Sequence, residues 1–232
     1  MELHWDKFQV LAVRSRGNIS APDGTPLKQV QHLQYLGAHL SAEADMGHEL
    51  GRRIGEAKRN FTTLRKVWSH SSLTWPRKLR IYSSIVESKL LYGLAGSCLT
   101  KSELRRLDGF QNRCVRQIIG VRPSWISRVS NIDVLTRANH ALASRQLLCK
   151  QMSLFGHVLQ ADSGHPPRTC TFAAGSLTPL TAASTRRVGR PHKEFAVDMT
   201  RVSQRIFGST IAAQHAARHS QHNFEQSVRS FL

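Results

Sequence analysis

Acidic residues are scarce in this chain of 232 residues. Aspartate and glutamate number 15 against 33 lysines and arginines, so the formal net charge is +18 and the isoelectric point lies near 11.0. An excess of this size argues against a cationic partner and favours a polyanion, for which nucleic acid is the first candidate. Most of these cations are arginines, whose planar guanidinium groups form paired hydrogen bonds to phosphate.

Long apolar runs and a secretory leader are also missing. No stretch of about eighteen apolar residues is present, and Met1–Trp5 has neither the cationic start nor the apolar stretch of a signal peptide. We therefore expect neither membrane insertion nor secretion. The cysteines lack the paired spacing of a zinc site or a disulfide framework, and a reducing compartment, the nucleus or the cytoplasm, follows. They are Cys98, Cys114, Cys149 and Cys170.

The sequence contains no adjacent aspartates. Nucleotidyl transfer by a polymerase needs close carboxylates that hold two cations about 4 Å apart. The aspartates of this chain are isolated from one another, and Asp45 and Asp133 are better explained as helix caps. We therefore predict no catalytic residue, no metal site and no bound cofactor in this chain.

The first 42 residues have the pattern of a small antiparallel β unit. Phe8–Val13 is short and rich in strand-forming residues, and 31–40 is a second candidate strand interrupted by Gly37. Between them, Pro22-Asp23-Gly24 is a strong turn signal.

A helical period begins after this unit. Apolar residues from Leu50 to Trp68 recur at steps of three and four, with Asp45 placed as the N-cap. Thr74 with Pro76 predicts the start of a second helix. Capping-box patterns open two later helices, Thr100 with Glu103 and Ser130 with Asp133, and Gly120 ends the first of these two.

Four segments follow from these patterns. We expect a β unit at 1–42, a helical bundle at 43–160, a flexible basic linker at 161–192 and a weakly helical polar tail at 193–232. The predicted fold class is therefore mainly α, with a small N-terminal antiparallel β unit, a helical bundle and a disordered basic tail.

Cations lie mainly outside the apolar stripes of the predicted helices. They could form an ordinary solvated face, but the net charge and the few neighbouring acids favour contact with phosphates. The candidates are Arg52, Arg53, Lys58, Arg59, Arg65 and Lys66 in the first helix and Arg105, Arg106, Arg113 and Arg116 in the third.

Short motifs follow one another in order over residues 1 to 160. They are Glu2–Lys7, Tyr35-Leu36-Gly37, Arg52-Arg53-Ile54, Lys78-Leu79 with Tyr82, Leu90-Leu91-Tyr92-Gly93, Phe110-Gln111-Asn112-Arg113-Cys114 and Phe155-Gly156-His157-Val158-Leu159. As a set, they resemble the region downstream of the catalytic aspartate pair in the reverse transcriptases of non-LTR (LINE-type) retrotransposons.

This resemblance implies the palm edge and thumb of an RNA-directed DNA polymerase, as a fragment without the catalytic aspartates. The Tyr35-Leu36-Gly37 hairpin would contact the primer end, and the cationic helices would grip a duplex of RNA template and DNA primer. The missing fingers and palm of the parent polymerase, which would use Mg²⁺, are further implied partners. The chain alone is not expected to polymerise nucleotides.

Other interpretations stay open. The chain could be an inactive retroelement relic or a domesticated helical interaction protein, or a sequence-specific DNA binder of the helix-turn-helix type. Arg187 and Arg190 belong to a basic segment around Gly189-Arg190-Pro191, which resembles an AT-hook core but also suits a basic tether. For Tyr92, Gly93 and His157 we expect packing or helix-end roles rather than ligand binding.

Overall fold

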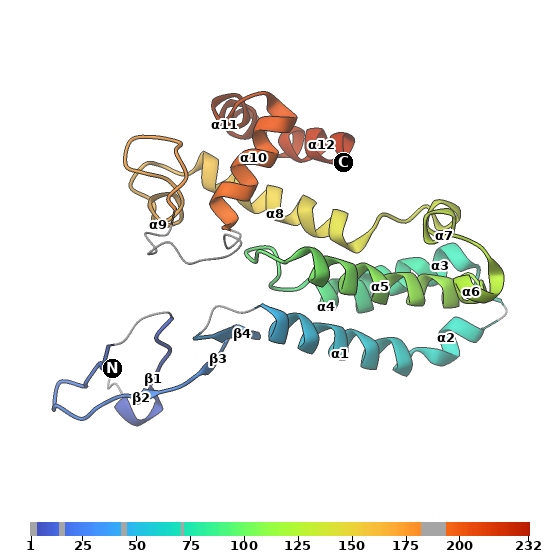
Figure 1. Cartoon of the computed structure of the whole chain (residues 1–232), viewed down its shortest axis with the longest axis horizontal. Coiled ribbons are helices and arrows are strands. Elements are labelled where there is room, and N and C mark those ends of the chain that lie inside the picture. The colour runs from blue at the N-terminus through green and yellow to red at the C-terminus, as the bar shows by residue number, and fades with distance from the viewer. Residues whose placement is uncertain (1–3, 14–16, 43–45, 71, 182–193) are drawn as a thin grey trace.

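The computed structural model describes residues 4–13, 17–42, 46–70, 72–181 and 194–232. The chain is mainly helical, with a small strand region at its N-terminal end, as the sequence predicts. Figure 1 shows the strands beside the start of α1, the long helix α5 between α1 and α8, and the C-terminal helices over α8.

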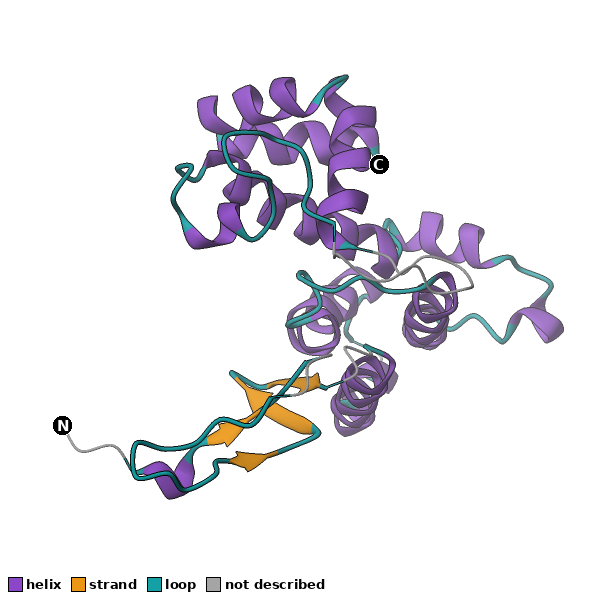
Figure 2. Cartoon of the chain, turned by 60° about the vertical axis from the view of Figure 1, so that its left-hand side comes forward, coloured by secondary structure: helices purple, strands orange, loops and turns teal. Residues whose placement is uncertain are grey.

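The strand region is built differently from the expected antiparallel unit. A short 3₁₀ turn, η1 (Trp5–Lys7), precedes β1 (Gln9–Val10), which pairs with β2 (Lys28–Gln29) in parallel. β3 (His32–Tyr35) and β4 (Ala38–Ser41) form an antiparallel hairpin within the second predicted strand (Figure 2).

The predicted Pro22-Asp23-Gly24 turn does form, but it closes a loop between β1 and β2. Asp23 Oδ1 accepts a hydrogen bond from the Thr25 amide at 2.9 Å, and Gly24 has a φ of 85°. The turn closes an antiparallel bridge between Ser20 and Pro26. The Leu27 amide also donates to the Ile19 carbonyl at 2.9 Å, so the turn joins these loop segments and does not join β1 to its parallel partner β2.

The central bundle contains the helices that follow the hairpin. They are α1 (Gly47–Thr63), α2 (Arg65–Ser69), α3 (Trp75–Ile81), the π-helical segment η2 (Tyr82–Glu87), α4 (Ser88–Leu91), α5 (Lys101–Ile118), α6 (Ser124–Ser127), α7 (Asn131–Ala138) and the first half of α8 (Ala143–Gln160). Their apolar stripes meet in one core that includes Leu50, Tyr82, Leu90, Leu107 and Val134, each completely buried. Burial of such side chains is the main stabilising contribution to a bundle of this kind.

Local capping signals determine where several helices begin. The capping boxes of Thr100 with Glu103 and of Ser130 with Asp133 are both formed, which confirms the two predicted helix starts. Thr74 is the N-cap residue of α3, although its side chain makes no capping hydrogen bond. The predicted cap Asp45 lies outside the described residues.

A second core corrects the expected tail. α10 (Phe195–Phe207), α11 (Thr210–His219) and α12 (Gln221–Phe231) pack on the second half of α8. Phe155 and Phe224 are fully buried there, and the rings of Phe207 and Phe224 stack at 4.9 Å. The polar composition concealed this packing, because alanines on α11 allow close helix approach without a strong apolar stripe.

The described part of the predicted linker is also packed. α9 (Pro166–Thr169) follows α8, and Phe172 is buried with its ring 5.8 Å from that of Phe155. Residues 182–193, which hold the rest of the predicted linker, lie outside the described residues.

Candidate nucleic-acid interface

The tip of the β3–β4 hairpin is an exposed two-residue turn. Leu36 and Gly37 both have positive φ angles, 47° and 75°, as the tightest hairpin turns require. Leucine adopts this backbone conformation only at a cost, so other contacts must hold the turn in place. Tyr35 and Leu36 are 62% and 76% exposed, and the turn therefore presents two large apolar side chains outward.

Side chains from α1 and from the residue that follows α4 contact this turn. The Gly37 carbonyl accepts hydrogen bonds from Arg52 Nη2 at 2.7 Å and Arg53 Nη2 at 2.5 Å. The Tyr92 hydroxyl, just after α4, donates to the Leu36 carbonyl at 3.0 Å. The Arg53 guanidinium also lies over the Tyr92 ring, 4.7 Å from its centroid, a favourable cation–π contact. The hairpin tip is thus attached to the bundle by three hydrogen bonds.

Glu49 positions the two arginines. Its carboxylate is nearly completely buried and accepts hydrogen bonds from Arg52 Nε at 2.8 Å and Arg53 Nε at 2.7 Å. The His39 amide on β4 donates to the same carboxylate at 3.2 Å. Burial by itself raises the pKa of Glu49, but the hydrogen bonds and charges of the arginines outweigh it and hold this pKa below its ordinary value.

These contacts correct one part of the predicted interface. Arg53 is only 5% exposed, and its guanidinium is used by Glu49, Gly37 and Tyr92. Arg52 is half-buried and bridges Glu49, Glu56 and Gly37. We therefore remove Arg53 from the predicted phosphate contacts and assign to both arginines the role of holding the hairpin.

Other predicted cations of the first two helices point outward. Lys58 and Arg59 on α1 and Arg65 and Lys66 on α2 are all exposed. Within the described residues, none of these four side chains forms an ion pair with a carboxylate. Their charges therefore face solvent uncompensated.

The cations of α5 divide into two groups. Arg105, Arg106 and Arg113 are exposed, whereas Arg116 is 6% exposed. Arg116 donates to Asn131 Oδ1 at 2.9 Å and to the carbonyls of Arg122 and Val129 at 3.0 and 2.7 Å. Arg116 thus ties down the loop between α5 and α7, and its prediction as a phosphate contact is corrected.

α1 and α5 bring their exposed cations onto a shared surface. The two helices contact each other and run in the same direction (Figure 1). A Cβ atom added to Gly51 would lie 3.8 Å from Arg106 Nη2, so these two positions are neighbours. Two helical turns further along, the same sides of the helices carry Lys58 and Arg113. We call Lys58, Arg106 and Arg113, together with the exposed Arg59 that follows Lys58 on α1, the α1–α5 basic face.

Acidic side chains near this face are already engaged. Glu49 and Glu56 pair with Arg52 and Arg53, and Glu103 caps α5. Asp108 accepts hydrogen bonds from the amide and hydroxyl of Ser144, both at 2.8 Å. The carboxylates of α1 and α5 therefore serve internal contacts, which leaves a net positive surface outside.

The predicted contacts Arg187 and Arg190 lie outside the described residues. Sequence reasoning did not single out the exposed Arg77 and Arg80 of α3, although their spacing of three residues was a signal for a shared helix face. It assigned Tyr92 to helix packing, whereas Tyr92 is 53% exposed and supports the hairpin. Gly93 follows the end of α4 with a φ of 74°, as a helix end requires.

We also searched the described residues for metal ligands, reactive thiols and membrane-spanning helices. It contains no group of three histidine, cysteine or acidic side chains close enough to hold a metal ion. Burial raises the pKa of the Cys114 thiol to about 12, so this cysteine stays protonated at neutral pH. None of the described helices has the length and apolarity needed to cross a bilayer.

Comparison of the chain with family models, with curated proteins and with solved structures found no match.

Proposed function

We propose that this protein binds nucleic acid by its phosphate backbone through the α1–α5 basic face. The observation that carries this proposal is the unequal use of charge on α1 and α5. Their carboxylates are engaged in internal contacts, while Lys58, Arg59, Arg106 and Arg113 are exposed. Exposed cations of this kind bind phosphates with little dependence on base sequence.

The fixed hairpin adds a second element to this proposal. Tyr35 and Leu36 project from a turn held by Arg52, Arg53 and Tyr92. An exposed apolar tip can pack against the exposed base pair or sugar at the end of a duplex, whereas the basic face follows its backbone. This arrangement suits the primer-end contact that the sequence resemblance implies for Tyr35-Leu36-Gly37.

The resemblance narrows the proposed ligand to a duplex of RNA template and DNA primer. In this proposal the chain is the thumb and palm edge of a retrotransposon reverse transcriptase. The catalytic aspartates, and the Mg²⁺ they would hold, belong to the fingers and palm of the parent polymerase. The chain on its own grips the duplex and does not extend the primer.

A salt titration tests this proposal. Fluorescence anisotropy would measure the binding of a labelled RNA–DNA hybrid and of a DNA duplex of equal length. We expect tighter binding of the hybrid, and a linear fall of log affinity with log salt concentration. In the double variant Lys58→Gln/Arg113→Gln, the slope of log affinity against log salt concentration should fall in magnitude by about 1 for each lost phosphate contact.

Arg218→Gln is the matched control, because Arg218 is exposed on α11, outside the basic face. Its slope should equal that of the unmodified protein. Absence of hybrid binding at low salt would overturn the proposal, as would an equal loss in the control.

Exposed apolar side chains favour a second candidate, an interaction protein derived from a retroelement. Leu36, Leu40 and Tyr92 are exposed around the hairpin, and a protein partner could cover them. This candidate predicts association that is insensitive to salt and is lost in Leu36→Asp, with hybrid binding absent.

A further inference from the structure

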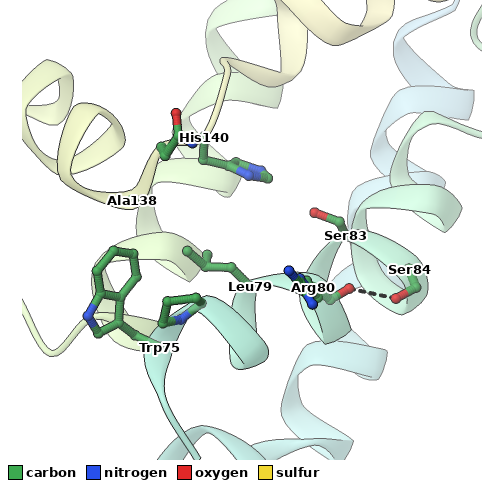
Figure 3. A pocket seen from close by; sticks show the side chains of 9 residues that line it. Trp75, Leu79, Arg80, Ser83, Ser84, Ala138 and His140 are labelled. Carbon is green, nitrogen blue, oxygen red and sulfur yellow. Dashed lines mark hydrogen bonds between the residues drawn. The ribbon is translucent and has the colours of Figure 1, made fainter.

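A pocket of about 740 Å³ opens between α3–η2 and the end of α7. Figure 3 shows Trp75 and Leu79 on one side, and Ala138 and His140 on the other. Arg80 and Ser83 lie on the α3–η2 helix next to them (Figure 3). The pocket has the size of a small-molecule site.

Local structure explains why these side chains line an opening. Trp75 and Pro76 form the first turn of α3, which lets the indole stay 45% exposed at the helix start. One turn after Leu79, the backbone changes to the π-helical segment η2. Short π-helical segments inside helices occur frequently at functional sites.

The opposite wall is held by a buried carboxylate. His140 Nε2 lies 3.0 Å from Glu87 Oε1, and Glu87 is only 3% exposed. The same oxygen accepts hydrogen bonds from Gln111 Nε2 at 3.0 Å and Gln146 Nε2 at 2.9 Å. The His140 ring also meets the Tyr82 ring at 5.9 Å in an edge-on contact. The imidazole is therefore fixed where it borders the pocket.

The lining combines a flat apolar surface with positive charge. Trp75 and Leu79 supply the apolar part, and Arg80 is an exposed cation. The described residues that line the pocket include no aspartate or glutamate. A ligand that complements this lining has a flat aromatic body joined to an anionic group.

We propose that this pocket binds one unpaired nucleotide of a single-stranded nucleic acid. Its base stacks on the Trp75 indole, and its phosphate pairs with Arg80. Stacking of a base on an aromatic side chain tolerates any base, which agrees with a described lining in which Asn139 is the one amide and no residue is acidic. This site goes beyond the proposed duplex contact, because it needs a base that is free of its partner strand.

Tryptophan substitutions test the pocket in the full chain. Trp75→Ala should weaken binding of a labelled deoxythymidine oligonucleotide about tenfold, and should leave binding of a blunt-ended RNA–DNA hybrid within about twofold. Arg80→Gln should weaken the same oligonucleotide, whereas Arg77→Gln, which is exposed but outside the pocket lining, should not.

Trp125→Ala is the matched control. Trp125 is 74% exposed on α6 and does not line the pocket, so its removal should leave the oligonucleotide affinity unchanged. Oligonucleotide binding should quench tryptophan fluorescence in this control but not in Trp75→Ala. Trp75→Phe, which keeps an aromatic face, should retain most of the affinity.

The outcomes separate this proposal from the duplex proposal. Suppose that the oligonucleotide quenches Trp75 but the protein does not bind the hybrid. This result would support the pocket proposal and overturn the proposal that the α1–α5 basic face binds a duplex. If Trp75→Ala and Trp125→Ala changed the oligonucleotide affinity equally, the pocket proposal would be overturned, regardless of the hybrid affinity. An equal loss of polyglutamate binding in Trp75→Ala would also overturn it, because the pocket would then accept any anionic chain.

Discussion

Arg53 on α1 and Gly37 in the hairpin turn are joined by a hydrogen bond of 2.5 Å from Nη2 to the carbonyl oxygen. This bond connects the strand region to the helical bundle across sixteen positions of sequence. Nε of the same guanidinium donates a hydrogen bond to Glu49 Oε1 at 2.7 Å. The hairpin tip is therefore held by a buried arginine, although the sequence pattern predicts an exposed cation at this position.

Arg53→Met should destabilise the protein, because it leaves the buried Glu49 with one arginine fewer. We expect a loss of about 3 kcal/mol in the free energy of unfolding, typical of breaking a buried ion pair. Urea unfolding followed by circular dichroism measures this loss. The control Arg59→Gln, an exposed position on the same helix, should change stability by less than about 0.5 kcal/mol. Equal effects would contradict the structural role of Arg53.

Stability should fall in acid through Glu49. Its pKa in the folded protein lies below the ordinary value of 4.5, so the folded state favours the ionised form. The resulting stabilisation is complete above the unfolded-state pKa and is lost as the pH falls through the lower folded-state pKa.

Glu49→Gln isolates this contribution. The variant should be less stable than the unmodified protein at neutral pH, and this difference should shrink once the pH drops below about 4.5. Urea unfolding midpoints measured at several pH values would show the convergence. A difference that stays constant down to about pH 3 would contradict the assignment.

Substitution by glutamine should lower the stability of the protein at Arg116 and the affinity for the hybrid at Arg113. Arg116→Gln removes three hydrogen bonds from a buried guanidinium, and should cost about 2 to 4 kcal/mol of stability. Arg113→Gln should leave the thermal midpoint unchanged and should weaken hybrid binding at low salt. Thermal unfolding and anisotropy on both variants provide the test. Loss of hybrid affinity in a fully folded Arg116→Gln alone would reverse the assignment.

Gly156→Ala should loosen the contact between α8 and α12. An added Cβ atom would lie 2.9 Å from both Phe224 Cε1 and Gln221 Oε1, and Phe224 is fully buried and stacked on Phe207. The overlap should cost about 1 to 3 kcal/mol, and should speed amide hydrogen exchange in α12.

Gly109→Ala is the control for this substitution. Gly109 also lies inside a helix, but nothing lies within 4 Å of its added Cβ atom. Its substitution should stabilise the protein by up to about 1 kcal/mol through helix propensity. A stabilising Gly156→Ala would show that α12 does not pack on α8 as described.

Local features of this fold could be predicted from the sequence because they depend on residues within one helical turn. The two capping boxes and the Pro22-Asp23-Gly24 turn are formed as expected. The apolar period from Leu50 to Trp68 places both of these residues in the core. Strand pairing was predicted incorrectly, since the partner of β1 depends on how the intervening loop folds.

In the candidate interface, too, the sequence predicted local features but not contacts between distant segments. Sequence reasoning selected Arg53 and Arg116 together with Lys58, Arg106 and Arg113, because charge and helical spacing do not reveal which cation has an internal partner. The partners of Arg53 and Arg116 include Gly37 and Asn131, which lie too far away along the chain for helix periodicity to identify them.

The sequence by itself determined the helical character, the starts of α5 and α7 and the large positive charge of this protein. These properties follow from composition and from interactions between near neighbours. Only the tertiary structure decided which arginines are buried as braces and which are exposed on the α1–α5 basic face. It also decided that the C-terminal helices share a core with α8, because burial depends on contacts between segments that are distant in sequence.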